Sequence, residues 1–280
     1  MVRSATAALL LTGAAFANDT ALTTGGTPKM MRRHRSVAMR SEVVRMTVGD
    51  RTVLVDCTFV FENLSSRPAT IQMGFPDVGF AAGDPDEEYG PDWRRTPPKS
   101  SFESFESWVN GRKVPVRLIR SERPGKFWHV KTVVFPARRR VVVRDRYVQI
   151  VGFGPARLSG DAFGWPSRAG YFLHTGASWR GPIGSSEVIV TFRRKGMSGN
   201  LRPWRIPAKD WFDGAPRRDW SHERGRVFYT GPCKPKVHGQ TLRFVRKNWH
   251  PSVTDDIGLV FDLKRVQPLG IWSGHRVRAM

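Results

Sequence analysis

The sequence predicts an all-β protein, an antiparallel β-sandwich built as two sandwich subdomains with long loops. Apolar and polar residues alternate with a period of two, as in the run from Val53 to Phe61. Twenty prolines and 27 glycines interrupt the 280-residue chain at short intervals. No window of useful length has helical periodicity. Many short strands between turn signals are typical of sandwiches.

The expected strands follow from this alternation and from the turns between them. Residues 63–68 (Asn-Leu-Ser-Ser-Arg-Pro) indicate a turn, and residues 76–101 a long loop. Asn110-Gly111 favours a type I′ hairpin. The expected strands are 53–61, 70–75, 127–135, 140–151, 171–174, 187–192, 227–229, 242–245 and 257–263.

The domain organisation is drawn from shifts in composition. Glycines and a proline at 152–155 indicate a boundary, after which most tryptophans lie. A single large sandwich is the alternative, since all-β domains can exceed 200 residues. The predicted segments are a signal peptide (1–17), an extended lead-in (18–34), an N-terminal sandwich (35–155), a C-terminal sandwich (156–267) and a poorly ordered tail (268–280).

The N-terminal segment is typical of a secretory signal. Arg3 precedes an apolar, small-residue stretch, and Ala15-Phe16-Ala17 forms an A-x-A cleavage pattern. Cleavage after Ala17 would make Asn18 the mature N-terminus. A buried N-terminal helix is the alternative. No later run is long enough to predict a transmembrane helix, so we expect a secreted or periplasmic protein.

Several short motifs carry a resemblance when taken in order. They are residues 18–21 (Asn-Asp-Thr-Ala), 59–63 (Phe-Val-Phe-Glu-Asn), 73–76 (Met-Gly-Phe-Pro), 171–179 (Tyr-Phe-Leu-His-Thr-Gly-Ala-Ser-Trp), 249–251 (Trp-His-Pro) and 255–257 (Asp-Asp-Ile). This order, over roughly residues 18–263, resembles a family of secreted bacterial proteins catalogued only as a domain of unknown function. The resemblance implies an exported all-β protein. It carries no catalytic assignment.

The charge indicates an anionic partner. The formal net charge is +22, and basic clusters include 32–35 (Arg-Arg-His-Arg) and 138–140 (Arg-Arg-Arg). Arginine binds phosphate and carboxylate groups bidentately. Outside the cell the candidates are anionic polysaccharides and lipopolysaccharide. A solvated basic surface is the alternative. No helix-turn-helix, zinc finger or RNP motif predicts a specific nucleic-acid interface.

Tryptophans in expected loops are the tentative ligand-binding residues, because an exposed indole can stack on a sugar ring. Packing in the core or its rim is the alternative. The tentative site residues are Trp93, Arg94, Trp204, Arg205, Trp211 and Trp220.

The sequence contains no enzyme or metal-binding motif with the required residues at the required spacing. Residues 176–180 lack the final glycine of a nucleophile elbow, and Arg157 replaces the third glycine of a dinucleotide motif. No histidines have zinc-site spacing, and we expect no cofactor. A carbohydrate-active hydrolase needs only two converging carboxylates, for example among Glu103, Glu106 and Glu187.

The chain has two cysteines, Cys57 and Cys233, in or near expected strands. Export would permit a disulfide between them, and two separate thiols are equally compatible with the sequence. Taken together, the sequence predicts an exported, non-enzymatic binding protein, with a polyanionic glycan as the candidate partner. A hydrolase with a carboxylate pair and a structural assembly module remain alternatives, and the oligomeric state is not predicted.

Overall fold

The structure is a computed structural model. It describes residues 19–22, 34–77, 100–121, 127–153, 156–157, 163–164, 166–195, 197, 199–208 and 225–262.

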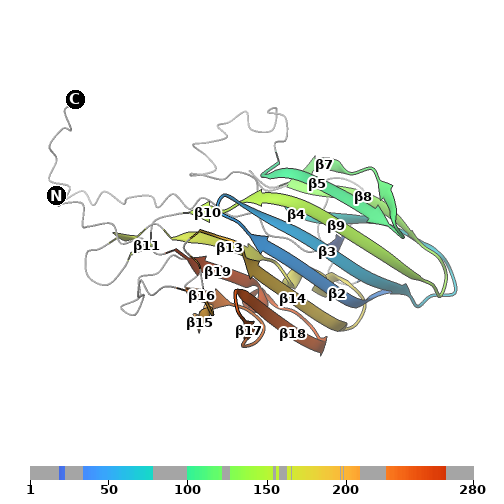
Figure 1. Cartoon of the computed structure of the whole chain (residues 1–280). Helices are drawn as coiled ribbons and strands as arrows, with labels where there is room; N and C mark the ends of the chain where they lie inside the picture. The colour runs from blue at the N-terminus through green and yellow to red at the C-terminus, as the bar shows by residue number, and fades with distance from the viewer. Residues whose placement is uncertain are drawn as a thin grey trace, which may run out of the picture.

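The described residues form the predicted all-β, sandwich-like fold, with mostly antiparallel sheets that do not close into a barrel (Figure 1). Two short 3-10 helices, η1 (His174–Ser178) and η2 (Val253–Asp255), interrupt the strands. Among the described residues, no helix is long and apolar enough to cross a membrane.

An eight-stranded sheet runs through the molecule in the order β17-β18-β14-β2-β3-β9-β5-β6. Figure 1 shows blue β2 directly beside yellow-brown β14. The strands are β2 (Val37–Val48), β3 (Thr52–Asn63), β5 (Phe102–Val109), β6 (Arg112–Val114), β9 (Arg140–Ile150), β14 (Ile183–Phe192), β17 (Lys236–His238) and β18 (Thr241–Trp249).

Smaller sheets pack against the large one. One has the order β1-β4-β8-β7 and another β10-β13-β19-β16-β15, while β11 and β12 form a ribbon. Their strands are β1 (Thr20–Ala21), β4 (Ala69–Asp77), β7 (Arg117–Arg120), β8 (Phe127–Phe135), β10 (Gly152–Phe153), β11 (Ala156–Arg157), β12 (Phe163–Gly164), β13 (Ser167–Tyr171), β15 (Arg202–Arg205), β16 (Arg226–Thr230) and β19 (Ile257–Phe261).

Aromatic side chains join these layers. Phe61 of β3 meets Phe135 of β8 at a centroid distance of 5.8 Å. On the other half of the sheet, Phe192 of β14 meets Phe261 of β19 at 5.2 Å. The first small sheet therefore covers one half of the large sheet, and the second covers the other half. Alternate side chains of the large sheet fill this interior, as period-two patterning requires.

The large sheet crosses the boundary expected near residues 152–155. β14 comes from the expected C-terminal sandwich and pairs with β2 from the expected N-terminal one. Buried residues from both halves also form one hydrophobic cluster. The two expected subdomains thus share the large sheet, and β10 (Gly152–Phe153) brings a strand of the expected N-terminal sandwich into the five-stranded sheet.

Three local expectations were wrong. β2 was not expected, because a bulge between Met39 and Ser41 shifts the phase of its alternation. The strand expected at 171–174 ends at Tyr171, where η1 soon follows. Two strand pairs, β14–β2 and β15–β16, are parallel. Parallel pairing joins strands distant in sequence, so no local turn signal reports it. Most of the expected loop 76–101 and the tail 268–280 lie outside the described residues.

Candidate functional site

Two basic segments far apart in the sequence meet where β2 and β14 begin. Because this pair is parallel, the starts of both strands lie at the same end of the sheet. The backbone N–H of His34 donates to the carbonyl of Ser178 (2.6 Å), and that of Arg180 donates to the carbonyl of Val37 (2.8 Å). Arg180 Nη1 also donates to the Arg35 carbonyl at 2.8 Å. Arg35 and Arg180 are thereby held side by side.

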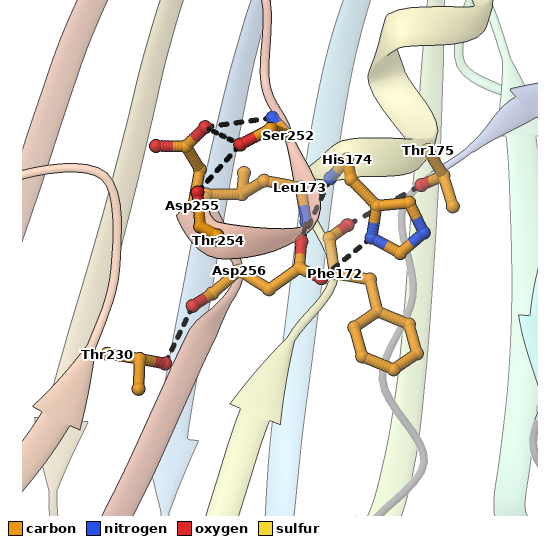
Figure 2. A network of polar contacts seen from close by, with 9 residues as sticks. All are labelled: Phe172, Leu173, His174, Thr175, Thr230, Ser252, Thr254, Asp255 and Asp256. Atoms are coloured by element: carbon orange, nitrogen blue, oxygen red, sulfur yellow. Dashed lines mark hydrogen bonds and ion pairs between the residues drawn. The ribbon is translucent and has the colours of Figure 1, made fainter. Parts of the chain in front are cut away.

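Asp256 fixes the start of η1, the 3-10 helix that precedes Arg180 in the chain, and Figure 2 shows these contacts. One carboxylate oxygen accepts the backbone N–H groups of Leu173 (2.7 Å) and His174 (2.9 Å). The other oxygen lies 2.7 Å from His174 Nδ1. The backbone carbonyl of Asp256 accepts the Thr230 hydroxyl at 2.8 Å. These bonds tie η1 to the segment between η2 and β19.

Trp179 secures the end of η1 from inside. Its side chain is buried, and its ring lies 4.5 Å from that of Phe61. Its indole Nε1 donates to the Asp19 carbonyl at 3.2 Å, and the Thr20 hydroxyl donates to Ser178 Oγ at 2.7 Å. An indole packed in the core and satisfied in this way holds its neighbours rigidly. The core thus positions Arg180, which is exposed.

A hollow of about 600 Å³ opens beside these residues and is lined by His34, Arg35, Arg180 and Gly181. None of these described lining residues is a carboxylate. His34 Nδ1 accepts the backbone N–H groups of Ser36 (3.2 Å) and Val37 (3.0 Å). Burial lowers the pKa of His34, which favours the neutral ring with its proton on Nε2. The hollow is therefore lined by two arginines and a histidine whose neutral form is favoured.

The outer face of the large sheet is also basic, and its carboxylates are paired. Asp56 binds Arg144, and Glu62 lies 2.9 Å from Arg40. Glu106 lies 2.5 Å from Lys113, and Glu187 lies 2.6 Å from Arg243. The pairing register gives this face the cations Arg45, Arg140, Arg144, Arg146, Lys236, Arg243 and Lys247.

Four of these cations are left over. Within the described part of the chain, Arg45, Arg146, Lys236 and Lys247 form no ion pair. All four are exposed, and Arg45 and Arg146 flank Asp56 on neighbouring strands. This open face, defined by the outward residues of β2, β9, β14 and β18, can bind anions beyond those of its own chain.

Trp204 and Arg205 are the only tentative ligand residues that lie in the described part of the chain, and they do not act as a pair. Trp204 is 47% exposed on the edge strand β15. The guanidinium over its ring belongs to Arg226, 5.4 Å from the ring centroid. Arg205 Nη2 instead donates to the carbonyl of Gly231 at 3.0 Å. Trp93, Arg94, Trp211, Trp220 and the cleavage residues Ala17 and Asn18 lie outside the described residues.

The two cysteines are free thiols in the structure. Cys57 is buried on β3, with its Sγ 3.5 Å from the Tyr171 hydroxyl. Cys233 Sγ lies 3.6 Å from the carbonyl of Val245. Of the two options that the sequence allowed, the structure has two separate thiols.

A cluster of Asp77, His129 and Ser100 has the composition of a hydrolase triad but not its geometry. His129 Nε2 faces both Asp77 Oδ2 (3.0 Å) and Ser100 Oγ (3.2 Å). A catalytic triad needs the acid and the nucleophile on different ring nitrogens. Burial raises the pKa of Asp77, but hydrogen bonds from His129, Ser101 and Ser100 outweigh it and hold that pKa below its usual value. This cluster joins the end of β4 to the start of β5.

The carboxylates named for a hydrolase do not converge. Glu106 on β5 and Glu187 on β14 are separated by β9, β3 and β2, which places them roughly 20 Å apart. A glycosidase pair lies within about 10 Å. Glu103 is exposed on β5. In the described ranges, no group of His, Cys, Asp and Glu is arranged to hold a metal ion.

Comparison with known proteins identifies the N-terminal part of the chain. Residues 17–121 match the family described as domain of unknown function (DUF4424). The resemblance inferred from the motifs is thereby confirmed for this region. The DUF4424 match includes His34 and Arg35 but not Arg180, so it covers half of the hollow. No curated protein sequence matches the chain.

A solved structure shares the fold, and others match at lower similarity. A protein from Legionella pneumophila, described as a candidate nutrient-binding protein, superimposes with a TM-score of 0.57 at 15% identity, over 88% of this chain and 70% of its own. Yeast LTA4 hydrolase matches at a TM-score of 0.41 and 10% identity, over 82% of this chain and 29% of its own. A zinc metallopeptidase from Deinococcus radiodurans matches at a TM-score of 0.35 and 12% identity, over 81% of this chain and 42% of its own. At 15% identity, the likeness to the Legionella protein is one of fold.

Arg180 is the lining residue of the hollow whose partners the sequence did not reveal. The sequence marks residues 32–35 as a basic cluster, whereas Trp179 stands in the separate motif 171–179. Only the parallel pairing of β2 with β14 brings them together. The alternation of residues 37–48, with its change of phase at the bulge, was the available sequence signal for this strand and hence for the pairing.

Proposed function

We propose that this protein is exported and acts, without catalysis, by binding a polyanionic glycan of the envelope or the extracellular space. The observation that carries the proposal is the open face of the large sheet. Its carboxylates are already paired, whereas Arg45, Arg146 and Lys247 remain exposed outside any described ion pair. A flat array of this kind suits a repeating chain of negative charges.

The signal-like N-terminus and the net charge of +22 support the same proposal. The structural neighbour described as a candidate nutrient-binding protein supports a binding role in general. The hydrolase alternative receives no support from Glu106 and Glu187, which three intervening strands separate, or from Glu103, which is exposed on β5.

The test is retention of the mature protein on immobilised heparin, followed by direct binding to purified lipopolysaccharide, at several salt concentrations. An open-face variant carries Arg45→Ser, Arg146→Ser and Lys247→Ser. A control variant with the same loss of charge carries Arg51→Ser, Arg67→Ser and Arg117→Ser, at exposed positions in turns and on β7.

We expect retention at low salt and release as salt rises, because binding displaces counterions. The open-face variant should lower the slope of log K against log salt by about one for each cation that no longer neutralises an anionic group of the glycan. The control variant should change the slope less. Flow-through of the wild-type protein at low salt, or equal losses in both variants, would contradict the proposal.

A further inference from the structure

The hollow beside the starts of β2 and β14 differs from the open face. It lies beside a turn that side-chain hydrogen bonds hold in place. The Arg180 guanidinium is bonded to the Arg35 carbonyl, and η1, which leads into this turn, is held by Trp179 and Asp256. Arg35 and Arg180 form no ion pair among the residues described. Arg35 and Arg180 therefore line a space of about 600 Å³ with no carboxylate among its described lining residues.

His34 lines the same space. Its Nδ1 accepts two backbone N–H groups, which leaves Nε2, on the opposite side of the ring, to donate. The ring is also held 6.0 Å from that of Trp179. Protonation would add a hydrogen at Nδ1 and break the two backbone bonds, so the ring donates one hydrogen bond as a neutral group.

We propose that this hollow binds a phosphate monoester group, with Arg35 and Arg180 as its charge partners and His34 Nε2 as a further donor. A phosphate monoester carries close to two negative charges near neutral pH, which matches the two guanidinium groups. A carboxylate or a sulfate ester carries only one. Guanidinium groups also bind phosphate oxygens in a bidentate manner. The inference rests on the proposed anionic partner, of which the hollow would hold a phosphorylated group.

The closing experiment titrates the mature protein with glycerol 2-phosphate by calorimetry at constant ionic strength and about pH 7.5, where the monoester is mostly doubly charged. Inorganic phosphate, methyl sulfate and acetate are titrated in parallel. Arg35→Ala is the main variant, because only the backbone of Arg35 bonds to Arg180. Arg180→Ala is the second variant, and Arg45→Ala on the open face is the control.

Glycerol 2-phosphate and inorganic phosphate should bind with similar affinity. Methyl sulfate and acetate should bind at least about tenfold more weakly, because a singly charged anion forms weaker charge-assisted hydrogen bonds with the two guanidinium groups. Arg35→Ala and Arg180→Ala should each weaken monoester binding by about tenfold or more, while Arg45→Ala changes it less than about twofold. No saturable binding of the monoester would overturn the inference. So would binding of inorganic phosphate alone, or equal losses in all three variants.

Failure here is distinguishable from failure of the proposed function. Heparin retention that depends on the open face, together with no monoester binding, would contradict only the proposed phosphate site and would leave glycan binding supported. Monoester binding that depends on Arg35, together with flow-through on heparin and lipopolysaccharide, would support the hollow and overturn glycan binding.

Discussion

Lys131 is a fully buried ammonium group that lies between two fully buried carboxylates. Its Nζ lies 2.8 Å from Asp19 and 2.6 Å from Asp145. Burial alone would lower the pKa of Lys131, but the charges of Asp145 and Asp19 outweigh it and raise that pKa. Burial, and then the charge of Asp145, raise the pKa of Asp19 well above its usual value. The three groups pin β1, β8 and β9 together.

The two carboxylates should respond differently to neutralisation. Asp145→Asn leaves Lys131 facing the carboxyl that ionises with difficulty, so we expect a loss of about 3–5 kcal/mol in unfolding free energy. Asp19→Asn resembles the protonated acid and should cost far less. Urea denaturation at neutral pH measures both. Asp56→Asn, in an exposed pair with Arg144, is the control and should cost less than about 1 kcal/mol.

The dependence on pH tests the same assignment. A carboxyl with a raised pKa in the folded state binds protons more tightly there than in the unfolded chain. Its contribution to stability is therefore largest at low pH and declines as pH rises through the raised pKa. Asp19→Asn should remove that decline. An equal loss of stability in Asp19→Asn and Asp145→Asn, with the decline unchanged, would contradict the assignment.

The parallel pair of β2 and β14 is the element that assembles the hollow. At Gly184, a Cβ would overlap the carbonyl oxygen of Arg40, which lies at the bulge of β2. Glycine is thus required for the close approach of the two backbones rather than for a turn. The bulge and Gly184 set where the pairing from Ser41 and Ser185 begins.

Gly184→Ala should force the two strands apart at their starts. We expect a loss of about 1–3 kcal/mol in unfolding free energy, as for other overpacked sites. Monoester binding should weaken as well, because Arg35 and Arg180 would separate. Ser185→Ala, at the next and half-buried position, is the control and should alter neither by much. Wild-type stability in Gly184→Ala would mean that the approach is looser than described.

At the scale of the molecule, one large sheet serves two purposes. Its inner face packs against the small sheets through Phe61, Phe192 and other aromatic residues. Its outer face keeps charged side chains in solvent, as the exposed Arg144 and Arg146 of β9 illustrate. Alternation along a strand puts these two chemistries on opposite sides. A protein of this design can use a wide surface for binding without opening its core.

The proposed export concerns the whole chain and has a direct test. Expressed with residues 1–17 in a bacterial host, the protein should be recovered outside the cytoplasm with Asn18 as its first residue, because Ala15 and Ala17 provide the small side chains of a cleavage site. Intact mass and N-terminal sequencing measure this. Ala17→Leu should slow processing, whereas Ser4→Ala should not. Recovery of the full-length chain from the cytoplasm would contradict export.

Local features of the sequence were enough to predict the all-β class and many strands. Alternation in β3, the Asn110-Gly111 turn and the strand 127–135 are properties of neighbouring residues, so a single segment reveals them. The resemblance to a family of unknown function followed from short motifs in order, and the family match confirms it for residues 17–121. The bulge in β2 was missed because a shift of phase at Arg40 hides the alternation.

Pairings between distant residues belong to the tertiary structure alone. The parallel contact of β2 with β14, the meeting of Arg35 with Arg180, and the burial of Asp19 beside Lys131 each join segments more than 100 residues apart. Nothing local specifies these partners, since a strand pattern states which face is apolar but not which strand lies beside it. The basic composition predicts an anionic ligand, and the pairing of strands decides where two arginines stand close enough to hold one.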